Sequence, residues 1–201
     1  DDQVYARLAS NEFDGIEHIV SLGQMLLLTS GSVAVISTKN DDAITPDSVN
    51  AVVQSSVGAS TVRPLVVNNV VLYVGSQGGH VWELGYQYEK GGYIPGDLSL
   101  RSTHLFDFKD IVDSAQSRSP QPIMWFVSTD GSLLGLTYIP EQAIGAWHQH
   151  TTDGTFESCA SVIEDGEDHL YCVVRREING QVVRYIERMN TRKIERLENA
   201  I

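Results

Sequence analysis

The sequence predicts an all-β protein of the β-propeller type, built from about four repeated antiparallel meanders of about 50 residues. Four stretches share one pattern, in which an apolar strand is followed by a short polar turn with glycine and then by a second strand. The glycines of these turns are spaced 48, 52 and 49 residues apart: Gly31, Gly79, Gly131 and Gly180. Val, Ile, Leu and Tyr dominate, and almost no segment has a helical period. Units of 40 to 50 residues with about four short strands are typical of propeller blades.

Each predicted hairpin is extended by further strands. The hairpins are expected within residues 25–37, 70–84, 125–138 and 170–187. A strand-like run precedes each of them, at residues 16–20, 62–67, 110–117 and 156–163. A fourth strand follows three of them, as at residues 50–56 and 145–150. Two segments depart from the pattern: residues 98–108, which are expected to hold a helical turn, and residues 191–201, which are expected to form a terminal helix or a frayed tail.

The expected organisation is one propeller-like domain with short flanks. Residues 1–15 form a lead-in, residues 16–189 the domain and residues 190–201 a basic tail. The repeated units are expected at residues 16–56, 62–97, 110–150 and 154–189. The last unit has no obvious outer strand after Met189, so the sequence favours an incomplete propeller whose open edges pair with another chain or are covered by the basic tail. Four units that close into a small ring are the alternative, and a β-sandwich, which has no long repeat, is the competing architecture.

Composition and charge exclude several classes of protein. With 201 residues, of which 42% are hydrophobic and 20% charged, the chain has the composition of a folded globular domain. No apolar run approaches the roughly 20 residues that span a bilayer, and no secretory signal opens the chain. The start at Asp1 without a methionine suggests a fragment or a processed chain.

The net charge of −12 is unevenly distributed along the chain. Residues 175–201 hold seven basic and four acidic residues, a charge of +3, whereas residues 1–174 hold seven basic and 22 acidic residues, a charge of −15. An acidic body is poorly suited to clamping phosphates, because nucleic-acid affinity comes largely from Lys and Arg. Simple solubility is the favoured explanation of the acidity.

Histidines and carboxylates are the first candidates for a metal site. His148 and His150 are two residues apart, so a strand places them on one face, which is the spacing of a bidentate metal clip. Packed or exposed imidazoles are the favoured explanation, and the other four histidines have no such partner: His18, His80, His104 and His169. Asp41–Asp42 and Glu164–Asp168 lack the ligand spacing of an EF-hand and are expected to form solvated turns. We therefore expect no metal and no cofactor.

No catalytic constellation is evident in the sequence. It contains no Gly-x-Ser-x-Gly, no phosphate-binding glycine loop and no Cys-x-x-Cys. The segment Gly75–Gly79 joins two strands and is therefore expected to be a turn. If residues 156–163 and 168–175 pair around a loop at residues 164–167, Cys159 and Cys172 face each other, and we expect them to be buried free thiols rather than a disulfide.

Several motifs together resemble a family of bacteriophage proteins. They are a strand with a glycine-bearing turn, a Thr-Pro-x-Ser segment, Glu-Leu-x-Tyr, an Asp-Gly hairpin, Trp followed by His, and a final pair of strands rich in arginine. In this sequence they fall on residues 28–37, Thr45 to Ser48, Glu83 to Tyr86, Asp130–Gly131, Trp147–His148, and Arg176, Gly180 and Arg184 to Arg188. From about residue 15 to residue 189 the chain is similar to the tail nozzle and packaged-DNA stabilisation proteins of short-tailed phages and prophages. Members of that family are several hundred residues long, so the resemblance implies that this chain is a middle section of a larger protein.

The resemblance implies a non-enzymatic virion structural protein. Such a protein is made in the bacterial host cytoplasm, lies in the virion tail, contacts other tail and portal proteins, and forms a homo-oligomeric ring around the channel. The DNA passes that channel without tight binding, for which an acidic wall is suited. The alternative is a stand-alone propeller that binds a ligand or acts on carbohydrate at its central channel. Against it, Trp82, Trp125 and Trp147 occupy different positions in their units.

Overall fold

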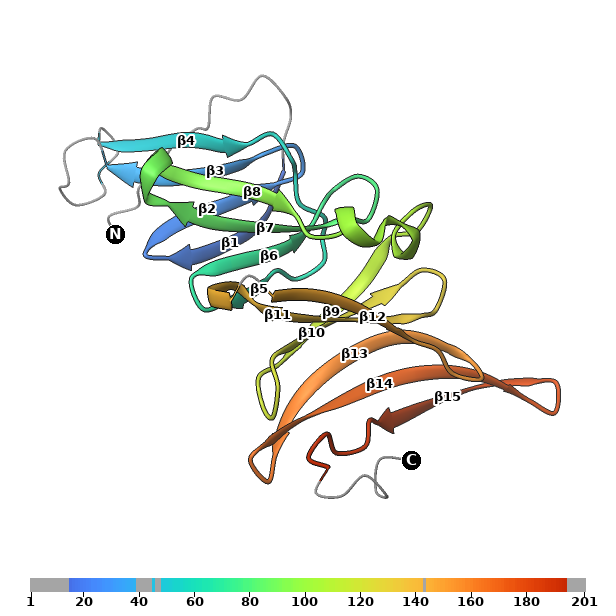
Figure 1. The fold of residues 1–201 in the computed structure, drawn as a ribbon. Helices are drawn as coiled ribbons and strands as arrows, with labels where there is room; N and C mark the ends of the chain where they lie inside the picture. Colours follow the sequence, from blue (N-terminus) through green and yellow to red (C-terminus); the bar gives the residue numbers. More distant parts are fainter. Residues whose placement is uncertain (1–14, 39–44, 46–47, 143, 195–201) are drawn as a thin grey trace. The chain divides into compact units, whose positions relative to one another are not determined.

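The protein forms two compact units, residues 1–100 and residues 101–201. The computed structural model describes residues 15–38, 45, 48–142 and 144–194. The sequence predicts a single domain over residues 16–189, and the division between the two units falls between the second and third of its repeats. Each unit contains two antiparallel sheets (Figure 1).

The first unit consists of two four-stranded meanders. The first sheet has the order β1-β2-β3-β4, and the second has the order β5-β6-β7-β8. The bounds of the first four strands are Ile16–Leu22, Gln24–Thr29, Val33–Thr38 and Val49–Ser55. Those of the next four are Leu65–Val67, Val70–Val74, Val81–Gln87 and Gly92–Asp97. A short 3₁₀ helix, Tyr88–Lys90, joins β7 to β8 and ends at Gly91 in the left-handed conformation.

One core joins these two sheets. Apolar side chains alternate along the strands, so every second residue of a strand enters the core. Leu26, Leu28 and Val35 come from the first sheet, and Val71, Tyr73 and Leu84 from the second. The Tyr93 hydroxyl donates to the Leu22 carbonyl at 2.8 Å, which adds a polar tie between the sheets.

The second unit holds a four-stranded and a three-stranded meander. Its first sheet has the order β12-β11-β10-β9, and its second has the order β13-β14-β15. The bounds of the four strands are Ile111–Ser117, Ile123–Ser128, Leu133–Ile139 and Ile144–His150. Those of the remaining three are Thr155–Glu164, Glu167–Ile178 and Gln181–Arg188. Two 3₁₀ segments, Leu100–Leu105 and Pro140–Gln142, precede β9 and β12.

The core of the second unit lies between its two sheets. Trp125, Val127 and Leu133 pack with Cys172 and Val174. The Trp125 indole N–H donates to the Ser117 hydroxyl at 3.1 Å, so its polar atom is satisfied although the side chain is buried.

The four sheets confirm the all-β prediction with propeller-like repeats. In every sheet the turn between the second and third strands carries the glycine that marks the repeat, namely Gly31, Gly79, Gly131 and Gly180. The helical turn predicted within residues 98–108 is the segment Leu100–Leu105, and residues 191–194 form no helix. Among the described residues the fourth sheet has three strands, and β15 forms its outer edge. The lead-in, residues 1–14, lies outside the described residues.

Candidate functional site

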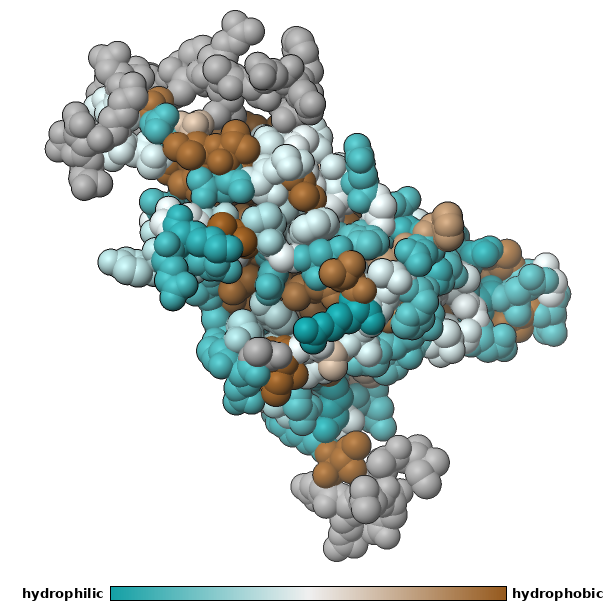
Figure 2. All heavy atoms as spheres, turned by 45° about the horizontal axis from the view of Figure 1, so that its top comes forward, coloured by the Kyte–Doolittle hydropathy of each residue, from teal (hydrophilic) through white to brown (hydrophobic). Residues whose placement is uncertain are grey.

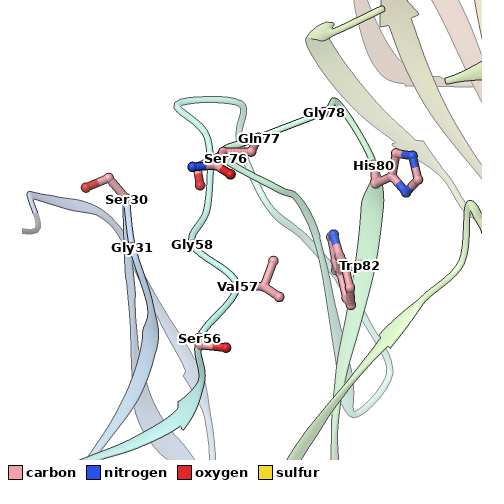
Figure 3. A pocket seen from close by; sticks show the side chains of 10 residues that line it. All are labelled: Ser30, Gly31, Ser56, Val57, Gly58, Ser76, Gln77, Gly78, His80 and Trp82. Carbon is pink, nitrogen blue, oxygen red and sulfur yellow. The ribbon is translucent and has the colours of Figure 1, made fainter. Parts of the chain in front are cut away.

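A cavity of about 390 Å³ opens in the first unit where turns of its two sheets meet. Residues from the β2–β3 turn, the segment after β4, the β6–β7 turn and β7 line it (Figure 3). They are Ser30, Gly31, Ser56, Val57, Gly58, Ser76, Gln77, Gly78, His80 and Trp82. The cavity therefore has a rim of hydroxyl, amide and glycine backbone groups.

Backbone contacts hold the turns around this cavity. The Ala59 N–H donates to the Thr29 carbonyl at 2.7 Å, and the Ser76 N–H donates to the Gly58 carbonyl at 2.9 Å. A Cβ on Gly58 would lie 1.9 Å from the Ser30 carbonyl oxygen, so only glycine permits this approach. The predicted turn at Gly75–Gly79 is confirmed, and it joins β6 to β7 as one wall of the cavity.

The side chains give this cavity one apolar wall and one oriented imidazole. In Figure 3 the side chain of Val57 points toward Trp82, whereas the His80 ring lies on the side of its strand away from Val57. His80 Nδ1 lies 2.8 Å from Asp97 Oδ2, and the Ser99 N–H donates to Asp97 Oδ1 at 2.8 Å. The imidazole is therefore held by Asp97, and the hydroxyl and amide groups of the rim face the cavity.

The predicted histidine pair is confirmed as a pair on one face of β12. His148 Nδ1 and His150 Nε2 lie 2.9 Å apart, and both rings pack against Trp125 with centroid separations of 5.7 and 5.5 Å. Burial lowers the pKa of both imidazoles, and for His148 the neighbouring His150 adds to this effect. Among the described residues no group of three or more His, Cys, Asp and Glu side chains is placed to hold a metal ion.

The predicted cysteine register is also confirmed. Cys159 lies opposite Cys172 in the β13–β14 ladder, and both are buried free thiols. Burial raises the pKa of Cys159 strongly and that of Cys172 to about 11, so neither thiol is activated at neutral pH. The predicted four-residue loop is wrong in length, because Glu164 and Glu167 pair with each other and only Asp165 and Gly166, both with positive φ, form the turn.

The expectation of a solvated turn is wrong for two of the carboxylates next to this hairpin. Glu167 and Asp168 are 4% and 8% exposed. Glu167 accepts hydrogen bonds from the Thr191 hydroxyl and the Arg192 N–H, and Asp168 accepts from the Arg118 and Ser119 N–H groups. Asp41–Asp42 lie outside the described residues.

The same cluster includes Arg192, from the described start of the basic tail. The Arg192 guanidinium donates to the carbonyls of Ser119, Gln121 and Asp168, at 2.8, 3.2 and 3.1 Å. In the described part of the tail, residues 190–194, these hydrogen bonds join Arg192 to the β9–β10 loop and to the start of β14. Sequence reasoning missed this contact, because Arg192 and its partners in the β9–β10 loop are more than 70 residues apart.

Comparison with known proteins adds no family assignment: no protein-family model matches the sequence, and no curated protein matches it. In the part of the chain that the structure describes, no helix is long and apolar enough to cross a membrane.

Proposed function

We propose that this chain is a non-enzymatic structural part of a short-tailed phage or prophage tail, of the nozzle or packaged-DNA stabilisation kind. In the virion it contacts other tail and portal proteins in a homo-oligomeric ring. The DNA passes the ring without tight binding. The chain is made in the host cytoplasm and acts in the virion tail.

The observation that carries the proposal is where the motifs of the resemblance fall. The described residues of each motif lie at a turn or in a paired strand of the repeated sheets. Residues at such positions stabilise the fold and serve a structural role. Thr45 and Ser48 exchange side-chain hydrogen bonds just before β4, and Asp130–Gly131 form the β10–β11 turn. The segments Glu83–Tyr86 and Trp147–His148 lie within β7 and β12.

The arginine-rich motif supports the absence of tight DNA binding. Arg176 binds Glu187 with two hydrogen bonds of 2.7 and 2.8 Å. Arg184 pairs with Glu157 at 2.6 Å, and Arg188 with Glu164 at 3.1 Å. Arginines that are paired in this way offer few charges to phosphates, and the rest of the chain is acidic. This pattern suits a channel wall along which DNA slides.

The surface is suited to contacts with neighbouring subunits. Apolar side chains reach the surface in patches between hydrophilic residues (Figure 2). On the first sheet they include Ile19, Met25, Val52 and Val53, and on the fourth Val182, Tyr185 and Ile186. The outer edge of β15 has no partner strand among the described residues, and such edges pair readily with another chain.

Proteomics of purified particles tests this proposal. Particles released by a host that carries the gene would be banded in a density gradient and analysed by mass spectrometry. We expect the protein in the particle band, in several copies for each portal ring, and its gene among portal, capsid and tail-fibre genes. Its presence only in the soluble fraction would overturn the proposal.

The cavity of the first unit favours one alternative, a stand-alone binding module or an enzyme that acts on carbohydrate. Trp82 offers an aromatic wall, and the rim offers hydroxyl and amide groups, which are the groups that hold a sugar. A panel of mono- and oligosaccharides titrated against the protein, with isothermal titration calorimetry as the readout, distinguishes the two functions. Saturable binding that Trp82→Ala abolishes would favour the alternative.

A further inference from the structure

We propose that His148 and His150 form a binding site for a divalent transition-metal ion, Cu²⁺ above all. This inference does not depend on the proposed function. It starts from the convergence of two nitrogens, since His148 Nδ1 and His150 Nε2 lie 2.9 Å apart. Imidazole nitrogens are preferred ligands of copper, nickel and zinc.

The sheet holds the two rings in place. His148 lies opposite Gly135, and His150 lies opposite Leu133, so both rings project from the same face of β12. A Cβ on Gly135 would lie 2.0 Å from His148 Cε1, which shows that the His148 ring occupies the space above the glycine. Trp125, on the far side of Gly135, packs against both rings. The three strands and Trp125 therefore keep the two imidazoles next to each other on one face of the sheet.

The nitrogen separation selects the kind of ion. Two ligand atoms 2.9 Å apart subtend an angle of about 90° at an ion about 2.05 Å from each, a normal metal–imidazole distance. Adjacent ligands at about 90° are found in the tetragonal geometry of Cu²⁺ and Ni²⁺, whereas tetrahedral Zn²⁺ requires a wider angle. Cu²⁺ binds nitrogen ligands more tightly than the other divalent ions of its row.

Binding requires a change of tautomer in one of the two rings, with no net loss of a proton. In the free protein one of the two facing nitrogens carries the proton of the hydrogen bond between the rings. When that proton moves to the outer nitrogen of its own ring, both facing nitrogens present lone pairs, and a turn of the rings directs them at the ion. Water completes the coordination.

The test uses the full chain without a histidine tag and Cu²⁺ as the probe, followed by calorimetry and electron paramagnetic resonance. We expect one equivalent to bind, with splitting of the copper signal by two imidazole nitrogens. His148→Gln or His150→Gln should weaken binding about a hundredfold, because a chelate becomes a single ligand. His104→Gln, which removes an exposed histidine of the same unit, should bind as the wild type does.

Two outcomes would overturn the proposal. One is a wild-type spectrum without splitting by two nitrogens. The other is unchanged affinity in the variant that combines His148→Gln with His150→Gln. The wild-type spectrum shows whether two nitrogens bind the copper ion, and it does not depend on the variants. Circular dichroism shows whether each variant is folded.

Discussion

Gly135 leaves the space that a side chain of β12 occupies. It pairs with Trp125 on β10 and with His148 on β12. Because Gly135 has no side chain, the His148 ring can lie directly over its Cα. A glycine in the middle of a strand usually weakens the sheet, so its presence here has a packing reason.

Gly135→Ala should therefore destabilise the second unit by about 1–3 kcal/mol, the usual cost of forcing atoms into a packed core. Gly145→Ala is the matched control on β12, because its Cβ would meet nothing closer than Tyr138 Cδ2 at 3.9 Å. That variant should stay within about 0.5 kcal/mol of the wild type. Urea unfolding measures the stability of both variants. Equal midpoints for Gly135→Ala and Gly145→Ala would contradict the packing role of Gly135.

Asp130 contributes stability that depends on pH. Burial by itself raises the pKa of its carboxyl, but the bonds from Lys109, at 2.8 Å, and from Ser132 outweigh burial and hold the pKa well below its usual range. A lowered folded-state pKa means that the stabilisation is present above the pKa of the unfolded chain and is lost as the pH falls toward the folded-state value.

Asp130→Asn should cost about 0.5–1 kcal/mol at neutral pH, because the ion pair with Lys109 is partly exposed. The difference from the wild type should shrink progressively below about pH 4, where the unfolded carboxylate takes up its proton. Unfolding by urea at several pH values measures this, and Asp107→Asn, at an exposed position, is the control. A stability difference that does not change with pH would contradict the lowered pKa of Asp130.

At the scale of elements, the hairpins could be predicted from local sequence, and the contacts between them could not. The β13–β14 register follows from the apolar pattern and the turn, and Cys159 faces Cys172 as predicted. The strand β8 is harder to predict, because Pro95 and the two glycines Gly92 and Gly96 lie within it. The cavity of the first unit depends on the approach of Gly58 to Ser30, a contact that no local pattern predicts.

The hydrogen bonds from Arg192 to the β9–β10 loop are also contacts between elements. Arg192→Ala should destabilise the second unit by about 1–2 kcal/mol, since three carbonyl groups lose their donor. Lys193→Ala removes an exposed neighbour with one long bond to Gly166 and should change stability little. Hydrogen exchange should also show faster exchange in the β9–β10 loop of the Arg192 variant alone. An unchanged exchange rate in the β9–β10 loop would contradict a stabilising role for the Arg192 hydrogen bonds.

For the whole molecule, the charge distribution predicts a low affinity for DNA. The basic residues of the fourth sheet are paired with glutamates, and residues 1–174 carry −15. We expect a Kd for duplex DNA weaker than about 100 µM at physiological salt, the weak limit of non-specific binding.

Neutralising the three glutamates that pair with arginines tests whether these ion pairs weaken DNA binding. The variant that combines Glu157→Gln, Glu164→Gln and Glu187→Gln frees the arginines and should bind DNA more tightly, with a strong dependence on salt. Fluorescence anisotropy with a labelled duplex measures both proteins. Tight, salt-sensitive binding by the wild type would be incompatible with DNA sliding past this surface.

A cryo-EM reconstruction of the tail of particles that contain this protein tests the central proposal most directly. We predict a ring of copies around the DNA channel, in which each copy fits density for both two-sheet units. A tail map that has no density for either unit, from particles with an intact tail, would contradict the proposed role.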